Sequence, residues 1–370
     1  MIHFDVMNFR LSLFFLFIIM ACVDRIEFDP GPSGESQIVI DGLITDEPGP
    51  YTVRLRRSQG IEDNLRVAPP FSANRVIISD DAGNSEVLEE GEFGVYATKA
   101  NGIRGTIGRT YTLRIENRDG TVYESSPELL RPVGKVDSIY YEFESLVPEN
   151  GPVLNGFKIF IDAQSDQGNE SFLRWKFTGT YRIATNPELH DVPCGESRCP
   201  DPRPCSGQII TNLGLTRVAD CECCVCWVNE IESRPLVSDN QFVAGGKFKK
   251  VQVGFVEVNE FTFFDKYQVA VEQMSLSQAA FDFWRAVQAQ QEGSSSLFQP
   301  PFGKAKTNVF PVNGGPEVQG IFYAAAVDRK TRFISRDEVP VEIPDISVVL
   351  SESCNLVFDF ASTTKPLDWD

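Results

Sequence analysis

Alternation of apolar and polar residues dominates the chain from residue 37 onward. Residues 37–44 form an apolar run typical of a buried strand, and residues 51–56 alternate strictly, as a half-buried strand does. Further short strands are predicted over residues 75–79, 111–116 and 121–124. Short strands separated by turn signals are typical of two packed sheets. This pattern predicts an immunoglobulin-like β-sandwich over residues 37–133.

The strand pattern continues through residues 134–370, which we assign to a second β-rich domain. One segment differs, because apolar side chains recur at helical spacing over residues 276–291. Ser275 is the expected N-cap of this helix, with Gln278 three residues later as its capping-box partner. We expect the apolar face of the helix to pack on the second sheet. The predicted fold is therefore mainly β, with one amphipathic helix and a cysteine-rich loop.

The N-terminus carries an apolar run of the length found in signal peptides. Residues 11–20 are too few to span about 30 Å of hydrocarbon as a helix. They lead into Ile19-Met20-Ala21-Cys22, which resembles a bacterial lipobox; an ordinary secretory signal is the alternative. We expect a lipoprotein signal peptide at residues 1–21 and acylation of Cys22, with palmitate as one chain. Residues 22–36, of which 29–36 are rich in Pro, Gly and Ser, would then form a flexible membrane tether.

Charge and histidine content exclude several classes of function. The chain has 34 Lys and Arg against 52 Asp and Glu, a net charge of -18, so nucleic acid is not an expected partner. His3 lies in the predicted signal peptide, which leaves His190 alone in the mature chain. Metal sites built on several histidines are therefore excluded. We expect His190 to be an exposed loop residue.

Cysteines concentrate in one insert, residues 187–229. Besides Cys22 there are eight, and an extracytoplasmic address favours up to four disulfides among them. Because adjacent cysteines rarely bridge, the dense cluster at residues 221–226 is expected to reach outward for its partners. A zinc or iron–sulfur site remains the alternative. The candidate disulfide cysteines are Cys194, Cys199, Cys205, Cys221, Cys223, Cys224, Cys226 and Cys354.

The sequence contains no recognisable catalytic or cofactor-binding motif. The chain contains no nucleophile elbow, no P-loop and no dinucleotide fingerprint. Glu257 and Glu260 are the candidate carboxylates for a glycan hydrolase, which needs two such groups. Trp369 is interpreted as part of a frayed C-terminus.

Several stretches recur in the order seen in one known family. They are residues 39–55, 108–115, 119–125 and 136–140, then Cys226-Trp227, Phe283-Trp284 and Gly320-Ile-Phe322. The chain thereby resembles a Bacteroidetes outer-membrane lipoprotein family known only as a domain of unknown function, commonly encoded beside TonB-dependent receptors. The resemblance implies a surface or periplasm-facing lipoprotein associated with a transporter, and it implies no catalytic residues.

These observations favour a binding function over an enzymatic one. We expect an outer-membrane, cell-surface lipoprotein that serves as a non-catalytic binding or accessory component of a TonB-dependent nutrient uptake system. Its expected partners are the membrane through the N-terminal lipid, a TonB-dependent receptor and a nutrient ligand. The alternatives are a carboxylate-based surface glycan hydrolase and a structural or adhesion protein of the cell envelope.

Overall fold

The computed structural model describes residues 36–59, 68–147, 151–166, 171–232, 234–293 and 305–369. Residues 37–58 and 68–370 form one compact unit. The predicted signal peptide, Cys22 and nearly all of the predicted tether lie outside the described residues. Among those that are described, no helix has both the length and the apolarity to cross a bilayer.

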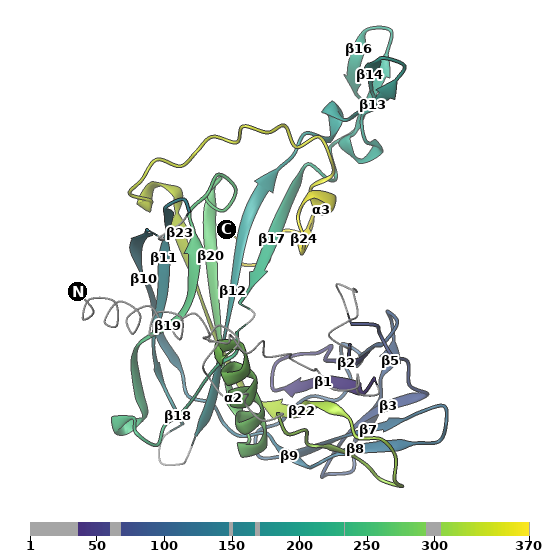
Figure 1. Ribbon diagram of the computed structural model, residues 1–370, viewed down its shortest axis with the longest axis vertical. Helices are drawn as coiled ribbons and strands as arrows, with labels where there is room; N and C mark the ends of the chain where they lie inside the picture. The colour runs from purple at the N-terminus through teal and green to yellow at the C-terminus, as the bar shows by residue number, and fades with distance from the viewer. Residues whose placement is uncertain are drawn as a thin grey trace, which may run out of the picture. The chain divides into compact units, whose positions relative to one another are not determined.

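Two sheets, most of whose strands come from the first third of the chain, pack around a shared core (Figure 1). Ile40, Val53 and Leu55 of one sheet and Ile78 and Leu113 of the other are fully buried in this core. In spatial order, the first sheet consists of β22 (Gln319–Ala325), β1 (Ile38–Thr45), β2 (Thr52–Arg57), β6 (Val95–Ala97) and β5 (Glu89–Glu90). The second consists of β21 (Val309–Pro311), β8 (Val122–Ser125), β7 (Thr110–Glu116), β3 (Arg75–Asp80) and β4 (Ser85–Val87), and β9 (Glu128–Leu129) pairs with β7.

Two strands of this first sandwich, β21 and β22, come from far along the chain. β22 runs parallel to β1, with Gly320 opposite Ile40. Gly320 has a φ of +91°, and a Cβ at this position would lie 1.8 Å from the Ile40 carbonyl oxygen. The close strand approach therefore requires glycine.

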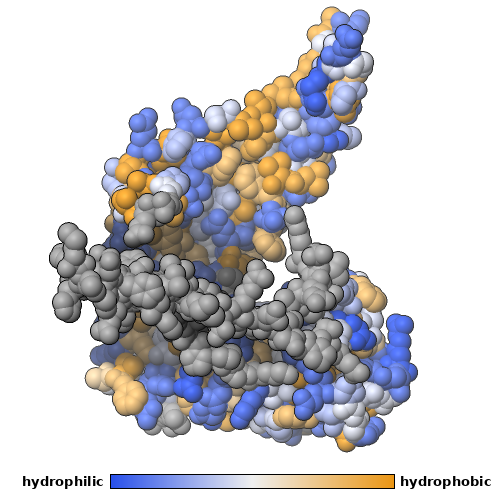
Figure 2. Space-filling model, viewed as in Figure 1, coloured by the Kyte–Doolittle hydropathy of each residue, from blue (hydrophilic) through white to orange (hydrophobic). Residues whose placement is uncertain are grey.

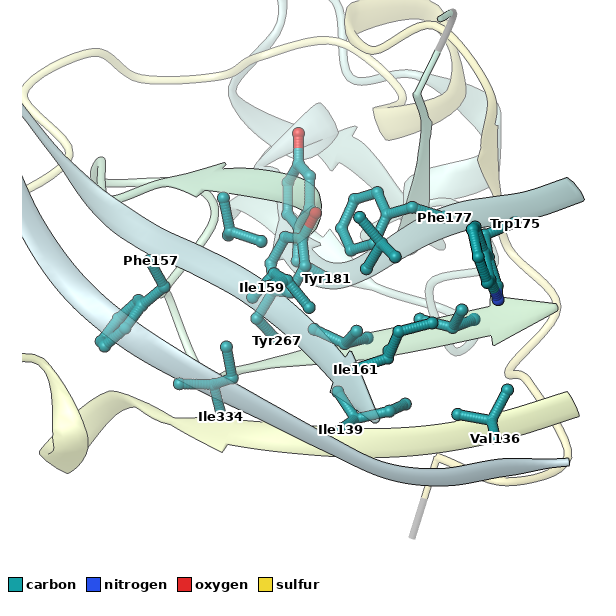
Figure 3. Close-up of a cluster of buried hydrophobic side chains, with 14 of the residues drawn as sticks. Val136, Ile139, Phe157, Ile159, Ile161, Trp175, Phe177, Tyr181, Tyr267 and Ile334 are labelled. Carbon is teal, nitrogen blue, oxygen red and sulfur yellow. The ribbon is translucent and has the colours of Figure 1, made fainter. Parts of the chain in front are cut away.

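The rest of the chain forms a second sandwich, so the mainly β prediction is confirmed. Its core, drawn in Figure 3, places Ile159 and Ile161 of one sheet beside Trp175, Phe177 and Tyr181 of the other. One sheet consists of β10 (Val136–Leu146), β11 (Leu154–Gln164) and β19 (Lys247–Glu257). The other consists of β23 (Val327–Ser335), β20 (Lys266–Leu276), β12 (Phe172–Ala184), β17 (Val225–Ile231) and β24 (Ala361–Ser362), and β18 (Leu236–Asp239) pairs with β12.

The predicted amphipathic helix is α2 (Gln278–Gly293), and its start differs from the prediction. Ser275 is not the cap, because β20 continues through Leu276 and the Ser275 hydroxyl bonds to two backbone groups outside the helix. It donates to the Arg131 carbonyl at 2.7 Å and accepts the Ala326 amide at 2.9 Å. Ser277 caps the helix instead, accepting the Ala280 amide at 3.1 Å. A second helix of four residues, α3 (Cys354–Val357), was not predicted.

The buried carboxyl of Glu128 in β9 is hydrogen-bonded to Asn308, the residue before β21. Its Oε1 accepts a hydrogen bond from Asn308 Nδ2 at 2.9 Å, and the same amide donates to the Phe322 carbonyl at 2.7 Å. Glu128 Oε2 is buried without a partner. Burial raises the pKa of the Glu128 carboxyl, and hydrogen bonds from Ser277 and Asn308 offset this only in part.

We expect Glu128→Gln to flatten the pH dependence of stability. A carboxyl with a raised folded-state pKa stabilises the protein fully below its unfolded pKa, and this contribution is lost as pH rises through the folded value. Urea unfolding of Glu128→Gln and the parent between about pH 5 and pH 8 should therefore show the variant gaining relative stability with pH. Glu89→Gln, at an exposed position, controls for the lost charge. Parallel curves for Glu128→Gln and the parent would contradict the assignment.

Candidate functional site

The cysteine-rich insert leaves and rejoins the second sandwich at a single place. Ala184 of β12 pairs with Val225 of β17, so residues 185–224, here called the arm, connect two neighbouring strands. Figure 1 shows β13, β14 and β16 beyond the ends of β12 and β17. The arm contains the 3₁₀ turns η1 (Pro187–Leu189) and η2 (Pro204–Ser206), and the hairpins β13 (Asp191–Cys194) with β14 (Ser197–Pro200) and β15 (Gln208–Thr211) with β16 (Gly214–Arg217).

All eight cysteines from Cys194 onward are paired. The disulfides are Cys194–Cys199, Cys205–Cys223, Cys221–Cys224 and Cys226–Cys354. Three of them lie within the arm or at its return, and the fourth joins β17 to α3. Cross-links supply here the rigidity that a small hairpin without a core lacks.

The pairing departs from the expectation that the 221–226 cluster would bridge only outward. Cys221 and Cys224 have CxxC spacing, a signal the sequence analysis missed, and they close on each other with a Cα–Cα separation of 5.7 Å. Cys205–Cys223 and Cys226–Cys354 do reach outward. Because these sulfurs are in disulfides, they are not thiolates for a metal. The described residues contain no group of three or more His, Cys, Asp or Glu that could hold a metal ion.

The β15–β16 hairpin presents apolar side chains to solvent. Leu213, at its turn, is 90% exposed, and about half of the surface of Ile209 and Ile210 is accessible. A two-stranded hairpin with no sheet packed on it cannot bury both faces. Exposed apolar side chains held on a cross-linked frame are typical of a contact surface for another molecule.

Polar side chains fasten the base of the arm to the C-terminal segment. Arg203 donates two hydrogen bonds to the Glu352 carboxylate, at 2.8 and 2.5 Å, and His190 Nε2 lies 3.2 Å from Glu352 Oε1. The prediction that His190 is exposed was wrong: it is buried, with Nδ1 2.8 Å from the Asp201 carbonyl oxygen. The Arg203 guanidinium lowers the pKa of the Glu352 carboxyl.

Glu352→Gln tests the contribution of the Arg203–Glu352 pair to stability. We expect the substitution to lower the free energy of unfolding by less than about 1 kcal/mol at neutral pH, because the pair is partly exposed to solvent and screened. The folded-state pKa of Glu352 is depressed, so its contribution exists above the unfolded value and is lost as pH falls through the folded one. The difference between Glu352→Gln and the parent in urea unfolding should therefore vanish in acid. Asp220→Asn removes a carboxylate that is 92% exposed in its ion pair with Arg217 and should have no effect at either pH. A loss that persists in acid would contradict this role.

The C-terminus is attached to the second sandwich, so the interpretation of Trp369 as a frayed end was wrong. Trp369 is 4% exposed and packs edge-on against Trp227 of β17 and Phe333 of β23. The Lys266 ammonium lies 5.5 Å from its ring centroid. Two aromatic neighbours on different strands therefore hold the last residues in place.

Glu257 and Glu260 lie around an open hairpin end. Glu257 is exposed at the end of β19, and Glu260 follows in a turn where Asn259 Oδ1 accepts the Phe261 and Thr262 amides at 2.9 Å. Glycosidase carboxylates face each other across an enclosed sugar. An exposed strand end provides no such enclosure, and the geometry lends the hydrolase alternative no support.

Comparison with known proteins assigns the family. Residues 23–331 match the family model described as "Domain of unknown function (DUF4249)". The chain belongs to this family. The DUF4249 match spans both sandwiches, the arm and α2, and it ends within β23 before the C-terminal segment that carries Glu352 and Cys354. Searches among curated proteins and among solved structures found no match.

Proposed function

We propose that this DUF4249 chain is an outer-membrane lipoprotein and a non-catalytic binding or accessory component of a TonB-dependent nutrient uptake system. The observation that carries the proposal is the arm, whose cross-linked hairpins present apolar side chains such as Leu213 to solvent. A frame ordered in advance loses little conformational entropy on association. Loops displayed on a rigid sheet are a common place for recognition.

The proposed anchor explains how such a contact would act. Acylation of Cys22 would hold the protein at the membrane through a short tether that ends at β1. Tethering raises the effective concentration of the arm near a receptor in the same membrane, so a weak contact would suffice. The resemblance to lipoproteins encoded beside TonB-dependent receptors supports this choice of partner.

Affinity purification from native outer membrane tests the proposal. The lipidated protein would be isolated in a mild detergent after metabolic labelling with palmitate, and its partners would be identified by mass spectrometry. We expect label on the parent, none on Cys22→Ala, and a TonB-dependent receptor in stoichiometric amount. An unlabelled protein that purifies without a receptor would contradict the proposal.

A further inference from the structure

The C-terminal segment beyond the family match carries a second exposed apolar surface. Val348 and Val349 are each 63% exposed, and Leu356 and Phe360 are each 74% exposed. We call these four residues the C-terminal patch. Figure 2 shows apolar residues on the surface where α3 and the segment leading to it lie. Exposed apolar side chains gathered on one surface are typical of interaction sites.

The backbone holds the patch in place. Cys354, between its two halves, is fully buried and cross-linked to the fully buried Cys226 of β17. On one side, the Leu350 carbonyl accepts the Asn186 amide of the arm at 2.7 Å. On the other, Ala361 pairs with Val228 of β17. The exposed side chains therefore stand on an ordered segment and not on a loose end.

Phe360 is kept exposed at a conformational cost. Its φ is +57°, in the left-handed region that residues other than glycine and asparagine seldom adopt. The Asn229 amide donates to its carbonyl at 3.3 Å, which fixes this backbone against β17. A large aromatic side chain in a strained backbone position, facing water, gains nothing for the isolated fold. A contact with a second molecule would account for both features.

The charge around the patch is of one sign. Residues 340–362 contain four acidic residues and no lysine or arginine. Glu352 is neutralised by Arg203, whereas Glu342, Asp345 and Asp359 are exposed and form no ion pair with any described residue. Apolar side chains flanked by unpaired carboxylates match a surface on which apolar groups are flanked by lysine and arginine.

The degree of exposure indicates the size of the occupant. Small-molecule sites are concave and enclose most of their ligand. The patch side chains, 63–74% exposed, stand out from the surface, as the anchors of a protein–protein contact do in the free protein. An anionic membrane surface would be repelled by the same carboxylates.

We propose that the C-terminal patch docks a partner protein whose contact surface combines apolar side chains with flanking lysine and arginine. The inference deepens the proposed function, on which it rests for the identity of that partner. It adds a contact separate from the β15–β16 hairpin and specifies the chemistry of the partner's surface.

Titration calorimetry on the whole mature chain with a short synthetic peptide that alternates leucine and lysine tests this chemistry. We expect the parent to bind the peptide and the affinity to fall about tenfold in Leu356→Ser and in Phe360→Asn. Asparagine is chosen at position 360 because it tolerates the left-handed backbone. Asp345→Asn/Asp359→Asn should weaken it in the same direction. Phe242→Ser is the matched control, because Phe242 is 91% exposed on the loop between β18 and β19, and it should bind as the parent does.

Several results would overturn the proposal. Equal affinity for a peptide that alternates serine and lysine would mean charge attraction alone. An equal loss in Phe242→Ser would mean apolar adhesion that is not specific to the patch. A dimer in sedimentation that Leu356→Ser abolishes would make a second copy the occupant. Leu356-dependent binding to vesicles of phosphatidylethanolamine and phosphatidylglycerol would make a membrane surface the occupant. Co-purification of the receptor with Leu356→Ser at the parent level would end this inference and leave the proposed function standing.

Discussion

Replacing Cys226 and Cys354 together by alanine should lower the free energy of unfolding by about 5 kcal/mol, the largest effect expected of any disulfide in this chain. The two cysteines are 128 residues apart, so their bridge restricts a long loop in the unfolded chain. Both are fully buried, and their removal also leaves unfilled volume in the second core. Urea unfolding under non-reducing conditions measures the loss.

The pair Cys194 and Cys199 provides the matched control. These residues are only five apart and close a local hairpin, so their double alanine variant should lose about 2 kcal/mol at most. It should also leave the second core intact. Equal losses for the two double variants would show that the long bridge adds no constraint of its own, contrary to the attachment of the C-terminal segment described above.

Gly320→Ala should destabilise the protein by about 3 kcal/mol or more, since strain at a positive φ adds to a backbone collision. The added Cβ would lie 1.8 Å from the Ile40 carbonyl oxygen, so β22 and β1 could not keep their parallel register. We expect a lower urea midpoint, together with faster amide exchange in β1.

Gly120→Ala separates strain from collision. Gly120 has a similar φ of +86°, but a Cβ there meets nothing within 4 Å. Its substitution should cost only about 1–2 kcal/mol, the price of the left-handed backbone alone. If Gly320→Ala cost no more than Gly120→Ala, the close approach of β22 to β1 would be contradicted.

Local patterns account for the features that the sequence predicted correctly. Alternation over residues 37–44 and 51–56 marked β1 and β2, and 3.6-residue spacing marked α2, because each signal is contained within its own segment. The start of α2 was misplaced because Ser275 and Ser277 both suit an N-cap. Only the pairing of β20 with β12, which places Ser275 opposite Leu173 and Leu276 opposite Phe172, shows that the strand extends past Ser275.

Features that depend on distant partners left no local signal. A parallel pairing between Val39 and Gln319 spans most of the chain, and neither segment specifies the other. Trp369 is buried by Trp227 and Phe333, which nothing in its own neighbourhood indicates. The buried His190 likewise lies beside Glu352, which is distant in sequence. The C-terminal segment was therefore the part least predictable from sequence.

Site-specific photo-crosslinking in intact cells tests the proposed function most directly. A photoreactive residue at Leu213 reports contacts of the arm, and one at Phe93, which is 63% exposed in the loop between β5 and β6, serves as the control. We predict that Leu213 cross-links to a TonB-dependent receptor and that Phe93 does not. Cross-links of equal yield from both positions, or none to a receptor from Leu213, would contradict an arm that contacts the receptor.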